Sequence, residues 1–231
     1  VNNWIYPIDK GYILIDTGYE SGFALFKKQL AKMQISPQQI RYIFLTHAHD
    51  DHAGYLNEVL SECPDLQIVM SDKALERLYR GQNSFHGGCT TKIALFFCYL
   101  MKFVGKGKHL FPSIKQEYQC RCIQVTEQNR KQVELLLQGK IIDTPGHTAD
   151  SISLLLNDGS LFCGDAAMNG LPSLHRITIW AEEKTAFLRS WETIIAHRPN
   201  LIYPGHGKPF EYEDLKINLK RAKNMELLPI Q

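Results

Sequence analysis

The chain contains the heptapeptide Thr46-His47-Ala48-His49-Asp50-Asp51-His52, which directly follows an apolar run typical of a buried strand. His47 and His49 are two residues apart, so in an extended segment both imidazoles point to the same side. Asp51 and His52 come next, where the pattern predicts the start of a helix. Such a density of nitrogen and oxygen donors is typical of a metal site, and imidazole with carboxylate suits zinc, iron or manganese.

Three other places put one candidate ligand beside a glycine, just after an apolar run. Each is weak alone, because a single His after a strand is more often a hydrogen-bonded loop residue. Together they add two histidines and one carboxylate to the first cluster. The three segments are Thr144-Pro145-Gly146-His147-Thr148, Cys163-Gly164-Asp165-Ala166 and Tyr203-Pro204-Gly205-His206-Gly207.

Apolar periodicity predicts strands in two batches, each followed by helices, which indicates a layered α/β sandwich. Asn157-Asp158-Gly159 is a strong hairpin turn within the second batch. The predicted strands cover residues 5–6, 12–15, 42–45, 68–70, 135–137, 140–143, 152–156, 161–163 and 201–203. The main predicted helices cover residues 52–60, 91–104, 182–197 and 212–225.

These motifs, in this order, resemble the metallo-β-lactamase superfamily over nearly the whole chain. The resemblance begins at Leu14-Ile15-Asp16-Thr17-Gly18 and continues through the H-x-H-x-D-H loop to the later His, Asp and His. It implies an α/β fold, the αββα four-layer sandwich of two mixed sheets flanked by helices. It also implies a site for two divalent metal ions, with zinc as the first expectation and iron or manganese as alternatives.

The resemblance further implies which residues hold each ion. His47, His49 and His147 would hold the first ion, and Asp165 would bridge both. One main branch of the β-lactamases has a zinc-bound Cys where this chain has Asp165. The carboxylate is more similar to the branch that contains glyoxalase II and lactonases.

The second ion would be held by Asp51, His52 and His206, and Asp51 could also carry a proton during catalysis. Asp16 resembles the family's Asp beside the ligand histidines. That role has a physical basis, because a metal-bound His needs an acceptor that fixes its other nitrogen.

The expected function is that of a dinuclear metal-dependent hydrolase, in which a metal-bridging hydroxide cleaves a small ester, thioester or lactone. One alternative is a phosphodiesterase or nuclease of the ribonuclease Z type, which shares the H-x-H-x-D-H loop. Another is an iron-dependent sulfur dioxygenase, which would rely on one metal. A non-enzymatic binding module would need degraded ligands, and all seven are intact.

The amino-acid composition limits the kinds of partner and the location that we expect. The net charge of +2 argues against a nucleic-acid partner and agrees with a small-molecule substrate. The six cysteines suit reduced thiols, so we expect a cytoplasmic protein. The longest apolar stretch is too short for a membrane span.

We expect residues 1–231 to form a single metallo-β-lactamase-like domain with a helical lid inserted at about residues 81–112. The segment combines an apolar helix with flanking glycines, which would let it move as a flap over the metal site. The alternative is that this helix completes the core or forms the interface of a homodimer.

Overall fold

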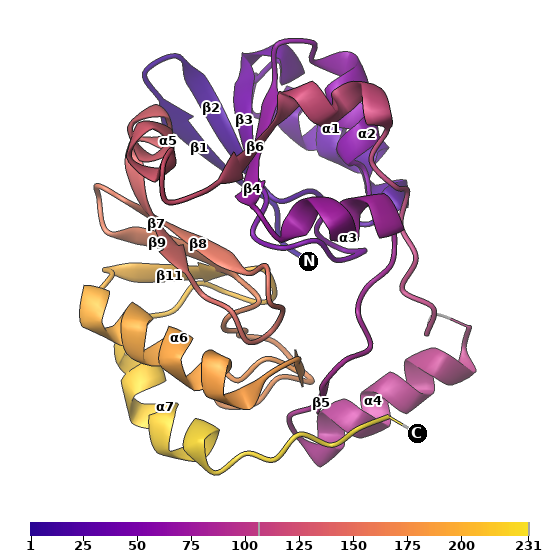
Figure 1. The fold of residues 1–231 in the computed structure, drawn as a ribbon, viewed down its shortest axis with the longest axis vertical. Coiled ribbons are helices and arrows are strands. Elements are labelled where there is room, and N and C mark those ends of the chain that lie inside the picture. The colour runs from indigo at the N-terminus through magenta and orange to yellow at the C-terminus, as the bar shows by residue number, and fades with distance from the viewer. Residues whose placement is uncertain (106, 231) are drawn as a thin grey trace. The chain divides into compact units, whose positions relative to one another are not determined.

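The computed structural model describes residues 1–105 and 107–230. It divides into two compact units, each with its own main sheet and helices (Figure 1). The first unit comprises Val1–Asn83 and Leu110–Gln138, and the second comprises Ser84–His109 and Gly139–Gln231. The prediction of a single domain with a lid at residues 81–112 stays a prediction.

The first unit contains a five-stranded sheet in the order β1-β2-β3-β4-β6. The first two strands, which were predicted at residues 5–6 and 12–15, pair antiparallel, and β2, β3, β4 and β6 pair in parallel. The central strands are apolar because parallel strands are buried on both faces. The strands are β1 (Trp4–Ile8), β2 (Gly11–Ile15), β3 (Ile40–Phe44), β4 (Gln67–Ser71) and β6 (Cys122–Val125).

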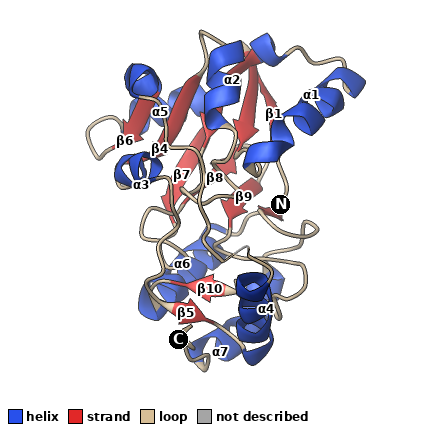
Figure 2. Ribbon diagram, turned by 90° about the vertical axis from the view of Figure 1, so that its right-hand side faces the viewer, coloured by secondary structure: helices blue, strands red, loops and turns tan. Residues whose placement is uncertain are grey.

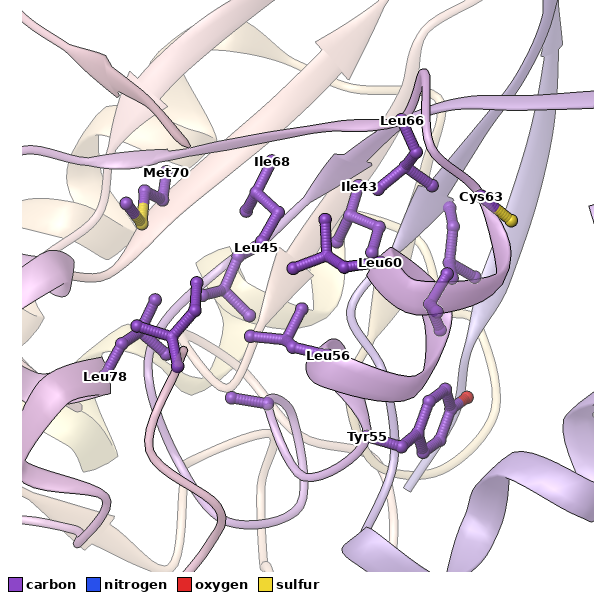
Figure 3. Packing of buried hydrophobic residues seen from close by; sticks show 14 of the residues in the cluster. Ile43, Leu45, Tyr55, Leu56, Leu60, Cys63, Leu66, Ile68, Met70 and Leu78 are labelled. Carbon is purple, nitrogen blue, oxygen red and sulfur yellow. The ribbon is translucent and has the colours of Figure 1, made fainter. Parts of the chain in front are cut away.

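The core of the first unit lies between this sheet and its helices. Leu56 and Leu60 of α2 pack in one buried cluster with Ile43 of β3 and Ile68 of β4 (Figure 3). Burial of this continuous cluster fixes the end of β3, from which the heptapeptide leaves the sheet. The helices are α1 (Phe23–Lys32), α2 (Leu56–Glu62), α3 (Ala74–Arg80) and α5 (Arg130–Leu137), with short 3-10 turns at Glu20–Gly22, Pro37–Gln39 and Gln116–Arg121.

The second unit contains a four-stranded sheet in the order β11-β9-β8-β7. The predicted hairpin between β8 and β9 is confirmed, and Gly159 in its turn adopts φ +85°, which favours glycine. Helices α6 and α7 lie together below this sheet in Figure 1 and share its core. The elements are β7 (Gly139–Asp143), β8 (Ile152–Leu156), β9 (Ser160–Gly164), β11 (Leu201–Pro204), α6 (Lys184–His197) and α7 (Glu213–Lys223).

A smaller substructure of the second unit carries the apolar helix of the predicted lid. Strand β5 (Gly88–Cys89) pairs antiparallel with β10 (Trp180–Ala181), and α4 (Lys92–Phe103) follows β5 (Figure 2). Among the described residues, no helix is long and apolar enough to cross a membrane.

Two predicted elements need correction. Residues 135–137 were expected to form a strand, but they form the last turn of α5, which ends at Gln138 in a left-handed conformation. The apolar run is helical because Val133 and Leu137, four residues apart, share the buried side. Helix α2 begins at Leu56 rather than at residue 52, because residues 46–55 form the loop that carries the candidate ligands.

Candidate metal centre

The first group of candidate ligands lies in the loop that follows β3 in the first unit. His47, His49, Asp51 and His52 are all buried although they are polar. The ring centroids of His47 and His49 are 4.6 Å apart, and those of His47 and His52 are 4.1 Å apart. Buried imidazoles need polar partners. The hydrogen bonds to each ring therefore decide which of its nitrogens is available to a metal ion.

Asp16 fixes the orientation of His52. Its Oδ2 lies 2.8 Å from His52 Nδ1 in a pair that is almost fully buried. A carboxylate oxygen accepts a hydrogen bond, so Nδ1 of His52 carries the proton and Nε2 presents its lone pair. The interaction therefore prepares His52 to bind a metal ion through Nε2.

The same carboxylate acts on His47 through Thr46. The backbone N–H of Thr46 donates to Asp16 Oδ1 at 2.7 Å, and the Thr46 hydroxyl donates to Asp16 Oδ2 at 2.8 Å. Because the hydroxyl proton is used in this way, its oxygen can accept from His47 Nδ1, which is 3.0 Å away. His47 therefore also presents Nε2.

Asp16 is itself held in an uncommon backbone conformation, with φ at 57°. Two backbone contacts keep it there, since the Asp16 N–H donates to Phe44 O at 3.1 Å and the Thr17 N–H donates to His52 O at 2.7 Å. Asn3 adds a third contact, because its Nδ2 donates to the Asp16 carbonyl at 3.3 Å. These three hydrogen bonds fix the backbone from which the Asp16 carboxylate extends.

Tyr55 and Asn83 support the same loop. Burial raises the pKa of the Tyr55 phenol above its usual range, so the phenol stays protonated and donates to Asn3 Oδ1 at 3.1 Å. Asn83 forms a pair of 2.8 Å hydrogen bonds with the backbone N–H and Oδ1 of Asp50. These hydrogen bonds hold the Asp50 side chain against Asn83. Asp51 is placed differently, because its Oδ1 lies 3.8 Å from His52 Nε2.

The second group of candidate ligands lies in the second unit, where each residue follows a strand. His147 comes after β7, Asp165 directly follows β9, and His206 comes after β11. The backbone N–H of Gly205 donates to Gly164 O at 2.7 Å, which joins the loop of His206 to the end of β9. The parallel pairing of β9 with β11 thus brings an Asp and a His from distant parts of the sequence to one edge.

Asp165 Oδ2 lies beside both histidines of this group. It is 3.7 Å from His147 Nε2 and 3.5 Å from His206 Nε2. Two ligand atoms that are each about 2.1 Å from a tetrahedral zinc ion lie roughly 3.4 Å apart. The donor atoms are all imidazole nitrogens or carboxylate oxygens, so the group fits divalent ions of this kind.

His147 is oriented by backbone rather than by a carboxylate. Its Nδ1 lies 2.8 Å from the carbonyl oxygen of Trp180 in β10 and 3.3 Å from Thr178 Oγ1. A carbonyl can only accept, so Nδ1 carries the proton and Nε2 faces Asp165. The loop is held by Glu182, whose Oε2 accepts from Ala149 N at 2.7 Å.

The backbone conformation and packing at position 146 require a glycine. Gly146 adopts φ +133°, and a Cβ atom at this position would lie 2.3 Å from backbone atoms of Phe187. The close approach of the loop to α6 therefore excludes a side chain immediately before His147.

Each unit thus brings its own predicted ligands together, and the predicted role of Asp16 has a clear geometric basis. The supporting roles of Thr46, Asn83 and Trp180 were missed. Thr46 is part of the heptapeptide and could have been considered as a partner, whereas Asn83 lies 33 residues after Asp50 and has no local signal. The Trp180 acceptor is a backbone carbonyl, for which the sequence carries no side-chain signal.

The chain belongs to the metallo-beta-lactamase superfamily, because the family's sequence profile matches residues 1–206. This is the family that the motifs resembled.

Curated relatives agree with this membership. The beta-lactamase-like protein 2 homolog of Drosophila melanogaster is 26% identical over 221 residues, which are 94% of this chain and 63% of the relative. The probable metallo-hydrolase MJ0888 of Methanocaldococcus jannaschii is 29% identical, with 87% and 85% covered. The hydroxyacylglutathione hydrolase of Glaesserella parasuis is 27% identical, with 72% and 50% covered. The chain therefore spans about three-fifths of the fly relative.

Solved structures confirm the predicted fold class. The archaeal metallo-beta-lactamase superfamily protein ST1585 from Sulfolobus tokodaii matches with a TM-score of 0.60 and 18% identity, covering 98% of this chain and 82% of that one. TTHA1623, solved in a di-iron-bound form, matches with a TM-score of 0.62 and 19% identity, covering 94% and 91%. At these identities the likeness shows the α/β metallo-β-lactamase fold alone.

Proposed function

We propose that this chain is a metal-dependent hydrolase that uses two divalent ions to cleave a small carboxylic ester, thioester or lactone. Membership of the superfamily supports the proposal, as do the hydrolase names of two relatives. The observation that carries it is the position of Asp165, whose Oδ2 lies within 3.7 Å of one histidine nitrogen and 3.5 Å of another. One carboxylate between two imidazoles is suited to bridge two ions.

The proposed assignment of ligands follows the order of the family's motifs and the donor orientation within each unit. Zinc is the first choice because the donors are imidazole and carboxylate, and iron is the alternative because the same donors suit it. The first ion would be held by His47, His49 and His147, the second by Asp51, His52 and His206, and both by Asp165.

The ions, when bound, would lower the pKa of water and polarise the substrate's carbonyl oxygen. The chain's own residues keep the donor atoms in place. Nδ1–H of His47, His52 and His147 is engaged by Thr46, Asp16 and the Trp180 carbonyl respectively, so each ring presents Nε2 without a further change of tautomer. Orientation of this kind reduces the reorganisation that catalysis would otherwise require.

Asp51 is the residue that we propose to move a proton to the leaving oxygen or sulfur. Its carboxylate is mostly buried and lies beside His52 Nε2, whereas the neighbouring carboxylate of Asp50 is bound to Asn83. The two adjacent residues therefore have different tasks, and the pair offers a matched control.

The test is a substrate panel with metal-loaded protein and the variants Asp51→Asn and Asp50→Asn. We expect turnover of an ester, thioester or lactone, and a loss of kcat in Asp51→Asn of about 100-fold or more. Asp50→Asn should keep nearly full activity, because an amide oxygen can still accept from Asn83. Turnover of a phosphodiester alone, or equal losses in the two variants, would overturn the assignment.

A small thioester is the first substrate to include. The support is the relative named hydroxyacylglutathione hydrolase, of which this chain spans half the length. Activity on a simple ester with none on the thioester would move the preference to esters and lactones.

A further inference from the structure

Helix α4 exposes a continuous row of large apolar side chains. Ile93, Phe96, Leu100 and Phe103 follow one another at three- and four-residue spacing, so they lie on one side of the helix. Phe96 is 72% exposed and Phe103 is 89% exposed. The buried side of the same helix is marked by Ala94, so this row is additional to the surface that packs on the protein.

Helix α7 shows why this row is unusual. Ile217 of α7 is also 73% exposed, but it is the one large apolar side chain of that helix among the exposed residues that the structure describes. The turns at both ends of α7 are charged, acidic in the first and basic in the last. Apolar side chains that are exposed singly are normal on protein surfaces, whereas contiguous apolar patches mark sites of interaction. The row on α4 therefore indicates a surface that binds a partner.

The charge around α4 limits the kind of partner. Residues 84–109 contain four lysines and neither Asp nor Glu. Lys92 begins α4 and Lys102 lies in its last turn, and both are exposed. In a symmetric dimer the same patch would face its own copy, which would bring these lysines together and cost free energy. A surface with negative charge complements the patch instead.

The helix is also short and firmly attached at its beginning. The Thr91 hydroxyl accepts from Ala94 N at 3.0 Å, and Cys89 exchanges two 2.8 Å backbone hydrogen bonds with Leu228. Its twelve residues span about 18 Å, which is too short to cross a bilayer. A short helix with exposed Phe and Leu and with lysines at its ends suits the interface of a membrane.

We propose that the exposed row of α4 docks the protein on the surface of an anionic lipid bilayer. The phenylalanines enter the boundary between headgroups and acyl chains, and the lysines contact anionic headgroups. This inference does not depend on the proposed hydrolase activity.

The experiment is flotation of the full chain with phosphatidylcholine vesicles, with and without about 30 mol% phosphatidylserine. We expect binding to the anionic vesicles to be at least about tenfold stronger than to the neutral ones, and to weaken as salt is raised. The double variant F96S/F103S should lose at least about tenfold in vesicle binding. Because both side chains are exposed, its circular dichroism and Tm should match those of the parent.

Two controls make the result specific. Ile217→Ser removes a similarly exposed apolar side chain from α7 and should leave binding unchanged. K92E/K102E keeps the apolar row and should remove the preference for anionic vesicles. Equal binding to both vesicle types, or equal loss in Ile217→Ser, would contradict the proposal. A dimer seen by light scattering that F96S/F103S dissociates, without vesicle binding, would assign the row to a second copy of the chain instead.

Discussion

The two groups of candidate ligands are built in different ways. In the first unit, four candidate ligands lie within one loop, and the carboxylate of Asp16 fixes His52 directly and His47 through Thr46. In the second unit, three candidate ligands follow the ends of three strands, and His147 is fixed by a backbone carbonyl. One group depends on a particular side chain, and the other depends on the pairing of strands.

This difference predicts different sensitivity to mutation. A carboxylate that serves two histidines can be removed by one substitution, so its loss should affect both ligands at once. A backbone carbonyl persists in every variant that keeps the fold. Outside the ligands themselves, single substitutions should therefore impair the first group more than the second.

The largest effect should come from Asp165→Ala, because Asp165 is the proposed bridge between the ions. We expect loss of most of the bound metal and a decrease in activity of more than about 100-fold, beyond the range typical of residues behind the ligands. Metal analysis and initial rates on the same samples test this. Retention of both ions with the fold intact would remove Asp165 from the ligand set.

Asp16→Ala should have the next largest effect, with metal affinity or activity reduced about 10–100-fold. Asp16→Asn is the sharper variant, because Asn tolerates the left-handed backbone at this position. The single amide oxygen of this variant can still accept from Thr46 N, but the NH₂ group would then face His52 Nδ1–H. If Asp16→Asn bound metal as tightly as the parent, the orienting role of this carboxylate would be wrong.

Thr46→Val should have a smaller effect, since it removes only the link between Asp16 and His47. We expect a decrease in metal affinity of roughly tenfold, at the lower end of the range for such partners. Thr46→Ser keeps the hydroxyl and should bind metal like the parent. A competition titration with a chromogenic chelator measures both variants, and equal affinities for Val and Ser would contradict the proposed link.

Trp180→Phe should have the smallest effect on metal binding, because the carbonyl that accepts from His147 is retained. The indole Nε1 donates to His86 O at 3.1 Å, and losing this bond should lower the free energy of unfolding by about 0.5–1.5 kcal/mol. Thermal unfolding and metal analysis separate the two quantities. A large loss of metal without a comparable loss of stability would show that the side chain itself supports the site.

Sequence patterns predicted much of this arrangement for a physical reason. A candidate ligand that follows an apolar strand can be recognised from a short stretch of sequence. Both the type of side chain and the end of the strand are local features of the chain. The same patterns did not predict the acceptor for His147, since a carbonyl of a two-residue strand has no side-chain signature. Residues 135–137 were misassigned because a short apolar run fits a strand or a helix equally well until its neighbours are placed.

The number of metal ions that each chain binds decides whether the proposed centre is dinuclear. The protein should be stripped with a chelator, reloaded with zinc and separated from free metal, and then measured by plasma mass spectrometry against its concentration. The seven proposed ligands, with Asp165 shared between two ions, predict a plateau at about two ions per chain, as in dinuclear hydrolytic sites. A plateau at about one ion per chain, with full activity, would show that the site is mononuclear.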